Sequence, residues 1–318
     1  MGDLLINCGY RVPYIFGGND LKLQNLSEHC YAFTGSVTIG YCIKEGKGLL
    51  IDSGLDDSSM KKVIKILSNE GLPLDFCVIT HAHADHFGGA HFLKKKQGTS
   101  LFAPKLEKAI IENSILEPIY LFNGANPIND LRNKFLEGQS VVIDDVLKIG
   151  ENSIGPFTFE VIDLPGHSYG QVGLLVDDVL YAADSYFGRD TLEKHVIPFI
   201  IDADQTLDSL EKLLHIPCKG AIPGHGDYEE NFVKTVQENI DLHEERMNTL
   251  LTLVNGSKEG FAFEKIMKEY LNLHKITVSN VGQWLLFRTS VTAYLTSLER
   301  KKLLSFTISN NELVIKPH

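Results

Sequence analysis

One short run of residues concentrates the side chains that could do chemistry. Residues 80–86 hold three imidazoles and a carboxylate, namely His81, His83, Asp85 and His86. The preceding residues, FCVIT, have the apolar, β-branched character of a buried strand. Because strand side chains alternate, His81 and His83 project to the same side, and Asp85 and His86 lie on the turn that follows. Imidazole with carboxylate favours zinc, iron, manganese or nickel over calcium or magnesium, so the run suits a pair of adjacent transition-metal cations.

Three more residues of ligand type follow strand-like runs later in the chain. His167 lies in LPGHS, Asp184 in LYAADS and His225 in IPGHGD. Each stands at a strand end beside small residues, so the backbone can approach a metal without obstruction. The alternative reading of residues 80–86 is a chance histidine-rich loop in solvent. That alternative leaves the downstream residues unexplained, and we disfavour it.

Together, HAHADH, PGHS, AADS and PGHG resemble the metallo-β-lactamase-fold hydrolase superfamily over about residues 1–245. The resemblance implies an α+β fold, an αββα sandwich, with a dinuclear metal centre. It implies two groups of metal ligands that share one bridging carboxylate: His81, His83 and His167; Asp85, His86 and His225; and the bridging Asp184. Asp52, at the end of GLLIDSG, resembles the family's strand-end aspartate that supports a ligand histidine, and a turn aspartate before Gly54 is the equal alternative.

The chemistry expected of such a centre is metal-assisted hydrolysis. Two divalent cations, zinc by preference with iron or manganese as alternatives, would hold a bridging water whose pKa falls toward ~7. The resulting hydroxide would attack a carbonyl carbon or a phosphorus centre. Asp85 is the predicted catalytic residue, because it can orient this nucleophile and accept its proton.

Three functions compete on this basis. The leading hypothesis is hydrolysis of a small ester, thioester or lactone, as in glyoxalase II-like enzymes. The second is an endoribonuclease or other phosphodiesterase. The third is a regulatory protein with a vestigial hydrolase site, which the complete ligand set disfavours. A β-lactam substrate is disfavoured, because zinc β-lactamases lack the bridging arrangement of Asp184.

The elements that position these residues form a repeating pattern. Strand clusters separated by helices occur twice, which indicates two packed sheets with helices outside. LLINC near the N-terminus is the first predicted strand, and helices are predicted over residues 56–69 and about 106–114. Residues 115–140 mix aromatic, proline and turn residues, and we interpret them as a long insertion near the site.

The C-terminal part has a different character. Helices are predicted over residues 229–254, 260–271 and 279–299, the last with Ser279 as its cap, and a hairpin turns at Asn310-Asn311. These are the parts of a winged helix. We therefore divide the chain into a catalytic domain, residues 1–245, and a winged-helix-like domain, residues 246–318.

This C-terminal tail resembles the extension of a subgroup of these hydrolases that includes a mitochondrial endoribonuclease of β-lactamase-like type. The basic cluster Arg300-Lys301-Lys302 is the place where it could touch RNA. The favoured alternative is a cap that packs on the catalytic domain or forms a homodimer, because the tail from Glu244 onward carries a net charge of only +3.

The composition narrows the classes of protein to which the chain could belong. The 318 residues carry a net charge of −11, which argues against broad nucleic-acid binding. No apolar run reaches the roughly 20 residues of a membrane span, and the acidic start MGDLLINCGY is unlike a secretory signal. Five scattered cysteines without a CxxC pair favour the reducing cytoplasm. The expected partner is a small-molecule substrate.

Several other residues are of a type that could belong to the site. His91 and the run of lysines at 94–96 are expected to be structural or solvated. Tyr186 could hydrogen-bond a tetrahedral intermediate, although it stands closer to Asp184 than the tyrosine of lactonases of this fold. For a further set, surface placement is favoured over substrate contact: Tyr169, Arg189 and His195.

Overall fold

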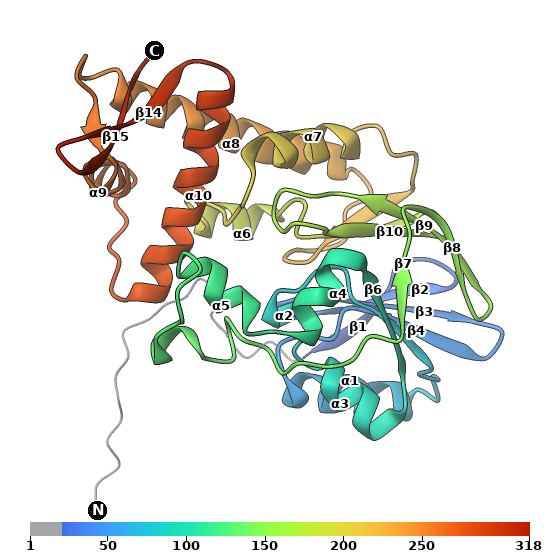
Figure 1. Cartoon of the computed structure of the whole chain (residues 1–318). Coiled ribbons are helices and arrows are strands. Elements are labelled where there is room, and N and C mark those ends of the chain that lie inside the picture. Colours follow the sequence, from blue (N-terminus) through green and yellow to red (C-terminus); the bar gives the residue numbers. More distant parts are fainter. Residues whose placement is uncertain (1–20) are drawn as a thin grey trace, which may run out of the picture.

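The structure, a computed structural model, describes residues 21–318, so the strand predicted in LLINC and Cys8 lie outside the described residues. Two sheets pack face to face with helices on both outer faces, which confirms the predicted αββα sandwich (Figure 1). None of the helices in the described part of the chain is both long and apolar enough to cross a membrane.

Within residues 21–318, the first sheet has seven strands in chain order. Its first four strands pair antiparallel and its last four pair parallel. The strands are β1 (Lys22–Asn25), β2 (Cys30–Thr34), β3 (Ile39–Lys44), β4 (Lys47–Ile51), β5 (Phe76–Val78), β6 (Ser100–Pro104) and β7 (Asp145–Leu147). Helical crossovers connect the parallel strands, so the carboxyl ends of β4 and β5 meet at one edge of the sandwich.

The second sheet has five strands in the order β12-β11-β10-β9-β8. All its pairs are antiparallel except β11 with β12. The strands are β8 (Gly150–Ile154), β9 (Phe157–Asp163), β10 (Val172–Val176), β11 (Val179–Ala183) and β12 (Gly220–Pro223). Side chains such as Leu49, Phe159 and Leu174 fill the space between the two sheets.

Helices cover the outer faces of the sandwich. The helices of this part are α1 (Asp57–Asn69), α2 (Ala84–Phe87), α3 (Ala90–Gln97), α4 (Lys105–Glu112), α5 (Leu116–Leu121), α6 (Arg189–Lys194), α7 (Ala203–Leu213) and α8 (Phe232–Val254). Met60 of α1 and Leu93 of α3 pack under the first sheet, and Leu210 of α7 and Val236 of α8 pack over the second. The predicted insertion at residues 115–140 contains α5 and a 3₁₀ turn, η1 (Asn129–Leu131).

The tail consists of helices and a small sheet. After α8 come β13 (Phe261–Ala262), α9 (Phe263–Leu273), α10 (Val281–Arg300), β14 (Leu304–Ser309) and β15 (Glu312–Pro317). The strands pair antiparallel in the order β13-β15-β14. The hairpin turns at Asn310 and Asn311, both with positive φ, as the sequence predicted. The predicted cap Ser279 is wrong: the neighbouring Asn280 caps α10 by accepting a hydrogen bond from the Gln283 amide.

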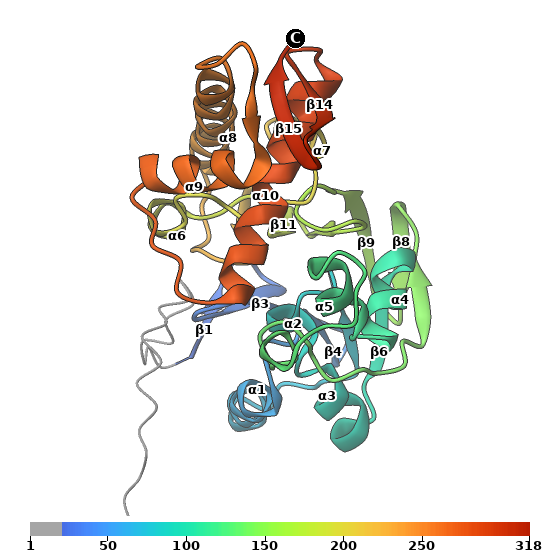
Figure 2. The ribbon, with the colours of Figure 1, turned by 60° about the vertical axis from the view of Figure 1, so that its left-hand side comes forward.

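The tail packs directly on the sandwich (Figure 2). Ile197, Ile200 and Ala203, which precede or begin α7, share one apolar cluster with Tyr270, Tyr294 and other residues of α8, α9 and α10. Leu285 of α10 packs against Leu121 of α5, so the tail also supports the insertion. The boundary predicted at 245/246 falls inside α8, which runs unbroken through it.

Candidate metal centre

The predicted ligands lie at the ends of strands, on one edge of the sandwich. His81 and His83 follow β5 of the first sheet, and Asp85 and His86 lie in the short helix α2 just beyond. The residues from the second sheet come after β9, β11 and β12: His167, Asp184 and His225. The loops of two sheets therefore meet at a single place, and the structure brings all seven predicted ligands together there.

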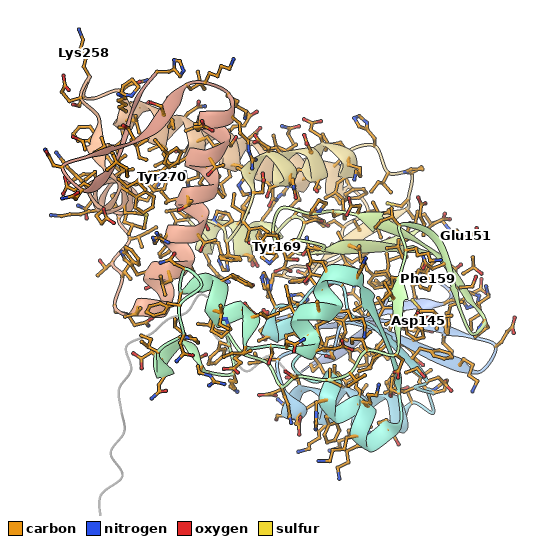
Figure 3. The ribbon with its side chains drawn as sticks, in the orientation of Figure 1. Asp145, Glu151, Phe159, Tyr169, Lys258 and Tyr270 are labelled. Atoms are coloured by element: carbon orange, nitrogen blue, oxygen red, sulfur yellow. The ribbon has the colours of Figure 1, made fainter. Side chains whose placement is uncertain are left out.

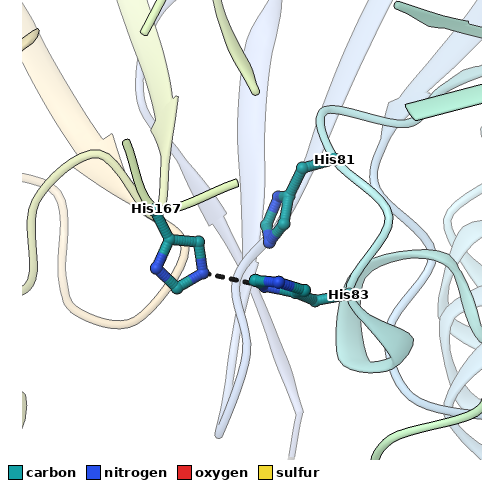
Figure 4. A group of neighbouring side chains, drawn as sticks. All are labelled: His81, His83 and His167. Atoms are coloured by element: carbon teal, nitrogen blue, oxygen red, sulfur yellow. Dashed lines mark hydrogen bonds between the residues drawn. The ribbon is translucent and has the colours of Figure 1, made fainter. Parts of the chain in front are cut away.

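The first group is formed by three imidazoles (Figure 4). His83 Nδ1 and His167 Nε2 face each other at 2.8 Å. The ring of His81 lies 4.7 Å from that of His83 and 5.2 Å from that of His167. Two ring nitrogens this close need either a proton or a cation between them, so the three rings form a nitrogen-lined site.

The second group combines a carboxylate with two imidazoles. The ligand atoms of Asp85, His86 and His225 lie within 4.8 Å of one another. His225 Nε2 is 3.4 Å from Asp85 Oδ2. Mixed nitrogen and oxygen donors at this spacing suit a first-row transition metal.

Asp184 lies between the two groups. One carboxylate oxygen is 3.4 Å from His86 Nε2, and the other is 3.3 Å from both His167 Nε2 and His225 Nε2. Gly224 makes room for this arrangement, because a Cβ there would lie 2.0 Å from the Asp184 Oδ1. Asp184 thus contacts residues of both groups, as the resemblance implied for a bridging residue.

Each buried imidazole is oriented by a partner on its other nitrogen. His86 Nδ1 faces Asp52 Oδ2 at 2.8 Å, and Asp52 also accepts from the amide and hydroxyl of Thr80. Of the two interpretations of Asp52, the structure supports the partner of a ligand histidine. His167 Nδ1 faces the Phe199 carbonyl at 2.9 Å and His225 Nδ1 faces the Ser36 carbonyl at 2.8 Å. These contacts leave Nε2 of each ring directed at the site.

Burial gives the first group a neutral character. Burial is the largest cause of the lowered pKa of His83, and the neighbouring His167 is the next. Together they lower this pKa to about 3. Burial and then His86 hold the pKa of His81 well below its ordinary value. The pKa of His167 is also lowered, because burial outweighs the attraction of Asp184. All three rings are therefore neutral at pH 7, with lone pairs available.

The second group differs from the first because its side chains are ionised before any metal binds. Burial lowers the pKa of His86, but the carboxylates of Asp184 and Asp52 outweigh it and raise the pKa well above its ordinary value. The same balance, led by Asp184, raises the pKa of His225 to about 10. Burial raises the pKa of Asp85, and the two imidazoles outweigh it and lower the pKa to about 2. Without metal, this group consists of imidazolium and carboxylate ions.

The residues present fit a pair of divalent cations. His81 Nε2, His83 Nε2 and Asp184 Oδ1 are buried and have no hydrogen-bond partner. Buried polar atoms are normally satisfied, so an unsatisfied cluster of donor atoms indicates a missing ligand. Asp52 lies close to His81 and His86, but its carboxylate is already occupied by Thr80 and His86, which makes it a support.

Sequence reasoning missed Glu107 of α4. Its side chain is fully buried, and its carboxylate accepts hydrogen bonds from the Ala82 amide, the Ser168 hydroxyl and the Gly170 amide. The chain around it, KLEKAIIE, reads as an ordinary amphipathic helix in which a glutamate is expected at the surface. No local signal could have identified it, because its partners come from two distant loops.

The structure also shows what the tail contacts near the site. Ile200, one residue after Phe199, donates its amide to Ser290 of α10 at 3.3 Å. Arg300 forms ion pairs with Asp202 and Asp204 at 2.9 and 3.0 Å. Lys301, beside it, lies 3.4 Å from Asp204. Two of the three residues expected to touch RNA, Arg300 and Lys301, are thus paired with carboxylates at the start of α7, which favours the alternative of a packed cap.

The other residues that the sequence offered as substrate contacts lie in the core, at the surface or beside the site. Tyr186 is buried among apolar side chains under α7 and α8, so the structure does not support its role beside a reaction intermediate. Arg189 pairs with Glu238 at 2.8 Å. His195 stacks on Phe187, whose ring also lies against His167 and His225. The others lie as expected: His91 is half-buried in α3, and Tyr169 is exposed.

Comparison with known protein families agrees with this site. The sequence pattern of the Metallo-beta-lactamase superfamily matches residues 34–225, and the chain belongs to that superfamily. The match runs from β2 to His225 and thus includes all seven residues of the centre. Homologous hydrolases and the two clusters imply that the chain is a metal-binding protein of a hydrolase family.

Individual proteins extend this comparison. The chain is 26% identical over 252 residues to an atrochrysone carboxyl ACP thioesterase of Aspergillus fumigatus, covering 78% of this chain and 67% of the other. It is 28% identical over 219 residues to a hydroxyacylglutathione hydrolase of Nitrobacter winogradskyi, covering 65% and 73%. In fold it resembles a beta-lactamase domain protein from Burkholderia ambifaria, with a TM-score of 0.73, 15% identity and coverage of 96% and 98%.

Proposed function

We propose that this chain hydrolyses a small thioester, or a related ester or lactone, with two divalent metal ions, zinc by preference. The observation that carries the proposal is the meeting of two ligand groups at Asp184, within contact distance of His167 and His225. Iron and manganese remain the alternative metals, because the same donor set suits them.

Divalent cations bound here would supply a nucleophile at neutral pH and polarise the carbonyl of the substrate. The chain's own contribution begins with Asp85, whose side chain keeps 16% exposure and whose Oδ2 lies 3.4 Å from His225 Nε2. We assign it the orientation of the attacking water and the acceptance of its proton. Asp184 holds the two ligand groups at a fixed separation. The Phe199 ring, 5.4 Å from the His83 ring, gives the acyl group an apolar wall.

The names of the relatives favour a thioester among the three substrates. One relative is named a thioesterase, and another is named a hydrolase of hydroxyacylglutathione. The ring of Tyr169, exposed and two residues beyond His167, packs edge-on against Tyr120 of α5 at 6.0 Å. Because Tyr169, labelled in Figure 3, stands two residues beyond the candidate ligand His167, we assign this pair of rings contact with the group that leaves with the sulfur.

A substrate panel tests this function. Metal-free protein is reconstituted with Zn²⁺ and assayed against thioesters, aryl esters and lactones of matched acyl groups. We expect metal-dependent turnover, highest for thioesters. In Asp184→Asn, loss of the shared carboxylate removes several kcal/mol of stabilisation, which lowers turnover about 1,000-fold.

The matched control is His91→Asn, since His91 lies in α3 and belongs to neither ligand group. This variant is expected to keep full turnover and full metal content. Absence of metal-dependent turnover with every substrate would reject the proposed reaction. Equal turnover by wild type and Asp184→Asn would reject the proposed site.

A further inference from the structure

Glu107 occupies an unusual place for an acidic residue. It lies in α4, its side chain is fully buried, and its two oxygens divide three donors between them. Oε2 accepts from the Ala82 amide at 2.7 Å. Oε1 accepts from the Ser168 hydroxyl at 2.8 Å and from the Gly170 amide at 2.6 Å. These short, charge-assisted hydrogen bonds satisfy both oxygens.

The donors belong to the two loops that carry the three-histidine group. Ala82 stands between His81 and His83, in the loop that follows β5 of the first sheet. Ser168 follows His167, in the loop between β9 and β10 of the second sheet. A single carboxylate therefore ties together two loops from different sheets, each at a residue adjacent to a ligand.

A charge in this position is costly. Among the side chains of the described residues, no cation is paired with Glu107, and burial outweighs its three donors and raises its pKa. A merely structural contact between two loops could be made by apolar side chains at lower cost. A planar group with two acceptor oxygens fixes the direction of amides from both loops at once.

We propose that Glu107 is a positioning residue of the metal centre, which sets the separation of the loop of His81 and His83 from the loop of His167. It acts through backbone and hydroxyl contacts and touches neither metal nor substrate. The proposal deepens the proposed function and rests on it only in requiring that the first group binds metal.

The variant Glu107→Gln isolates this role. Glutamine has nearly the same shape but only one acceptor oxygen, so its NH₂ group must face the donor of one loop. We expect one of the two loops to move while the fold persists. Loss of a partner beyond the ligands typically costs about 10- to 100-fold in metal affinity, and we expect that loss for the first equivalent of Co²⁺.

The experiment titrates metal-free protein with Co²⁺ and follows its visible absorption, which reports the coordination geometry without any substrate. The matched control is Glu112→Gln in the same helix, because Glu112 also accepts from a backbone amide, that of Ile143, and pairs with Lys108. We expect this control to bind Co²⁺ with an affinity within about twofold of wild type, since a half-exposed pair contributes little.

Unchanged Co²⁺ affinity and spectrum in Glu107→Gln would overturn the proposal, and so would an equal loss in Glu112→Gln. If Glu107→Gln does not fold, Ser168→Ala decides, because it removes one donor and leaves the carboxylate in place. We expect Ser168→Ala to weaken the first Co²⁺ about fivefold, the equivalent of one hydrogen bond, and unchanged affinity would overturn the proposal. Because the readout is metal binding, a failure of the proposed hydrolysis remains distinguishable.

Discussion

The two ligand groups differ in their charge before any metal binds. Burial and mutual repulsion keep the imidazoles of His81, His83 and His167 neutral. The carboxylates around His86 and His225 keep those imidazoles protonated. The first group can therefore accept a cation without losing protons, whereas the second must exchange protons for metal. The two sites of one centre can therefore differ in whether the binding of a metal releases protons.

The groups also differ in what holds them. His86 is supported by Asp52, which directly follows β4 of the first sheet. His167 is supported by the carbonyl of Phe199, in a segment that α10 of the tail holds. Both groups thus depend on contacts with distant parts of the chain, since His225 of the second group is oriented by the Ser36 carbonyl, but only the first group is connected to the tail.

Among the changes that test this comparison, the largest effect is expected where the carboxylate shared by both groups must move. Gly224→Ala places a Cβ 2.0 Å from Asp184 Oδ1 and 2.8 Å from His86 Cε1, so the shared carboxylate must move. A displacement of about 1 Å can cost about 100-fold in rate, and we expect that loss of turnover with weaker binding of both metals. Metal content by mass spectrometry and steady-state kinetics check it.

Gly282→Ala is the control, because in α10 its nearest neighbour would be Asn280 Oδ1 at 3.3 Å. We expect this control to retain its metal and turnover. Two tightly bound metals in Gly224→Ala would contradict the placement of Asp184 between the groups.

Asp52→Asn sharpens the comparison by weakening mainly the second group. Asparagine tolerates the positive φ of 68° at this position, but it removes the negative charge that faces His86. We expect the second metal to bind about tenfold more weakly and the first to lose less affinity, because Asp52 reaches His81 only through the Thr80 hydroxyl, which lies 3.0 Å from His81 Nδ1. Titration with Zn²⁺ against a competing chelator separates the two equivalents, and equal weakening of both would contradict the division.

The proton exchange itself gives a dependence on pH. The pKa of His225 is about 10 and that of His83 is about 3 in the metal-free protein, so near pH 7 only the first of these rings must lose a proton. Affinity for the second metal should rise with pH, about tenfold per pH unit for each proton displaced, and affinity for the first should stay constant. Calorimetry in buffers of different ionisation enthalpy counts the protons, and equal counts for both equivalents would refute the charge difference.

The smallest effect is expected from the tail. Ser290→Ala removes the acceptor of the Ile200 amide, next to the carbonyl that orients His167. One lost hydrogen bond is worth about 1 kcal/mol, or about fivefold in affinity for the first metal only. Thr292→Val is the control, because the Thr292 hydroxyl bonds to Arg288 within its own helix. A change in the second metal instead of the first would contradict the assigned path.

The sequence predicted the sandwich and the place of all seven candidate ligands, because these follow from strand ends and short local motifs. The apolar run of β5 places His81 and His83 just beyond the strand end, and Asp85 and His86 follow within three residues. Helix α1 was equally accessible, since Asp56 caps it through the amides of Ser58 and Ser59. In each case the determining residues are neighbours in the chain.

What could not be predicted depends on contacts between distant residues. Glu107 accepts from Gly170, 63 residues away, and Arg300 pairs with Asp202, 98 residues away. The first looks like a surface glutamate and the second like a free cation until the chain is folded. Tyr186 shows the opposite case, in which a residue near the site in the sequence lies away from it in the structure. It stands close to Asp184 in the sequence, whereas its side chain packs in the core beneath α7.

The unbroken helix α8 has a mechanical consequence. Its 23 residues extend about 35 Å from the sandwich into the tail. Near the predicted boundary, the His243 ring lies 2.8 Å from the Tyr294 hydroxyl, and Arg246 donates to the Val196 carbonyl. The helix is therefore a rigid connection, and the tail cannot move away from the site as a separate domain. A truncation at residue 245 would interrupt this helix and expose the surface that it buries.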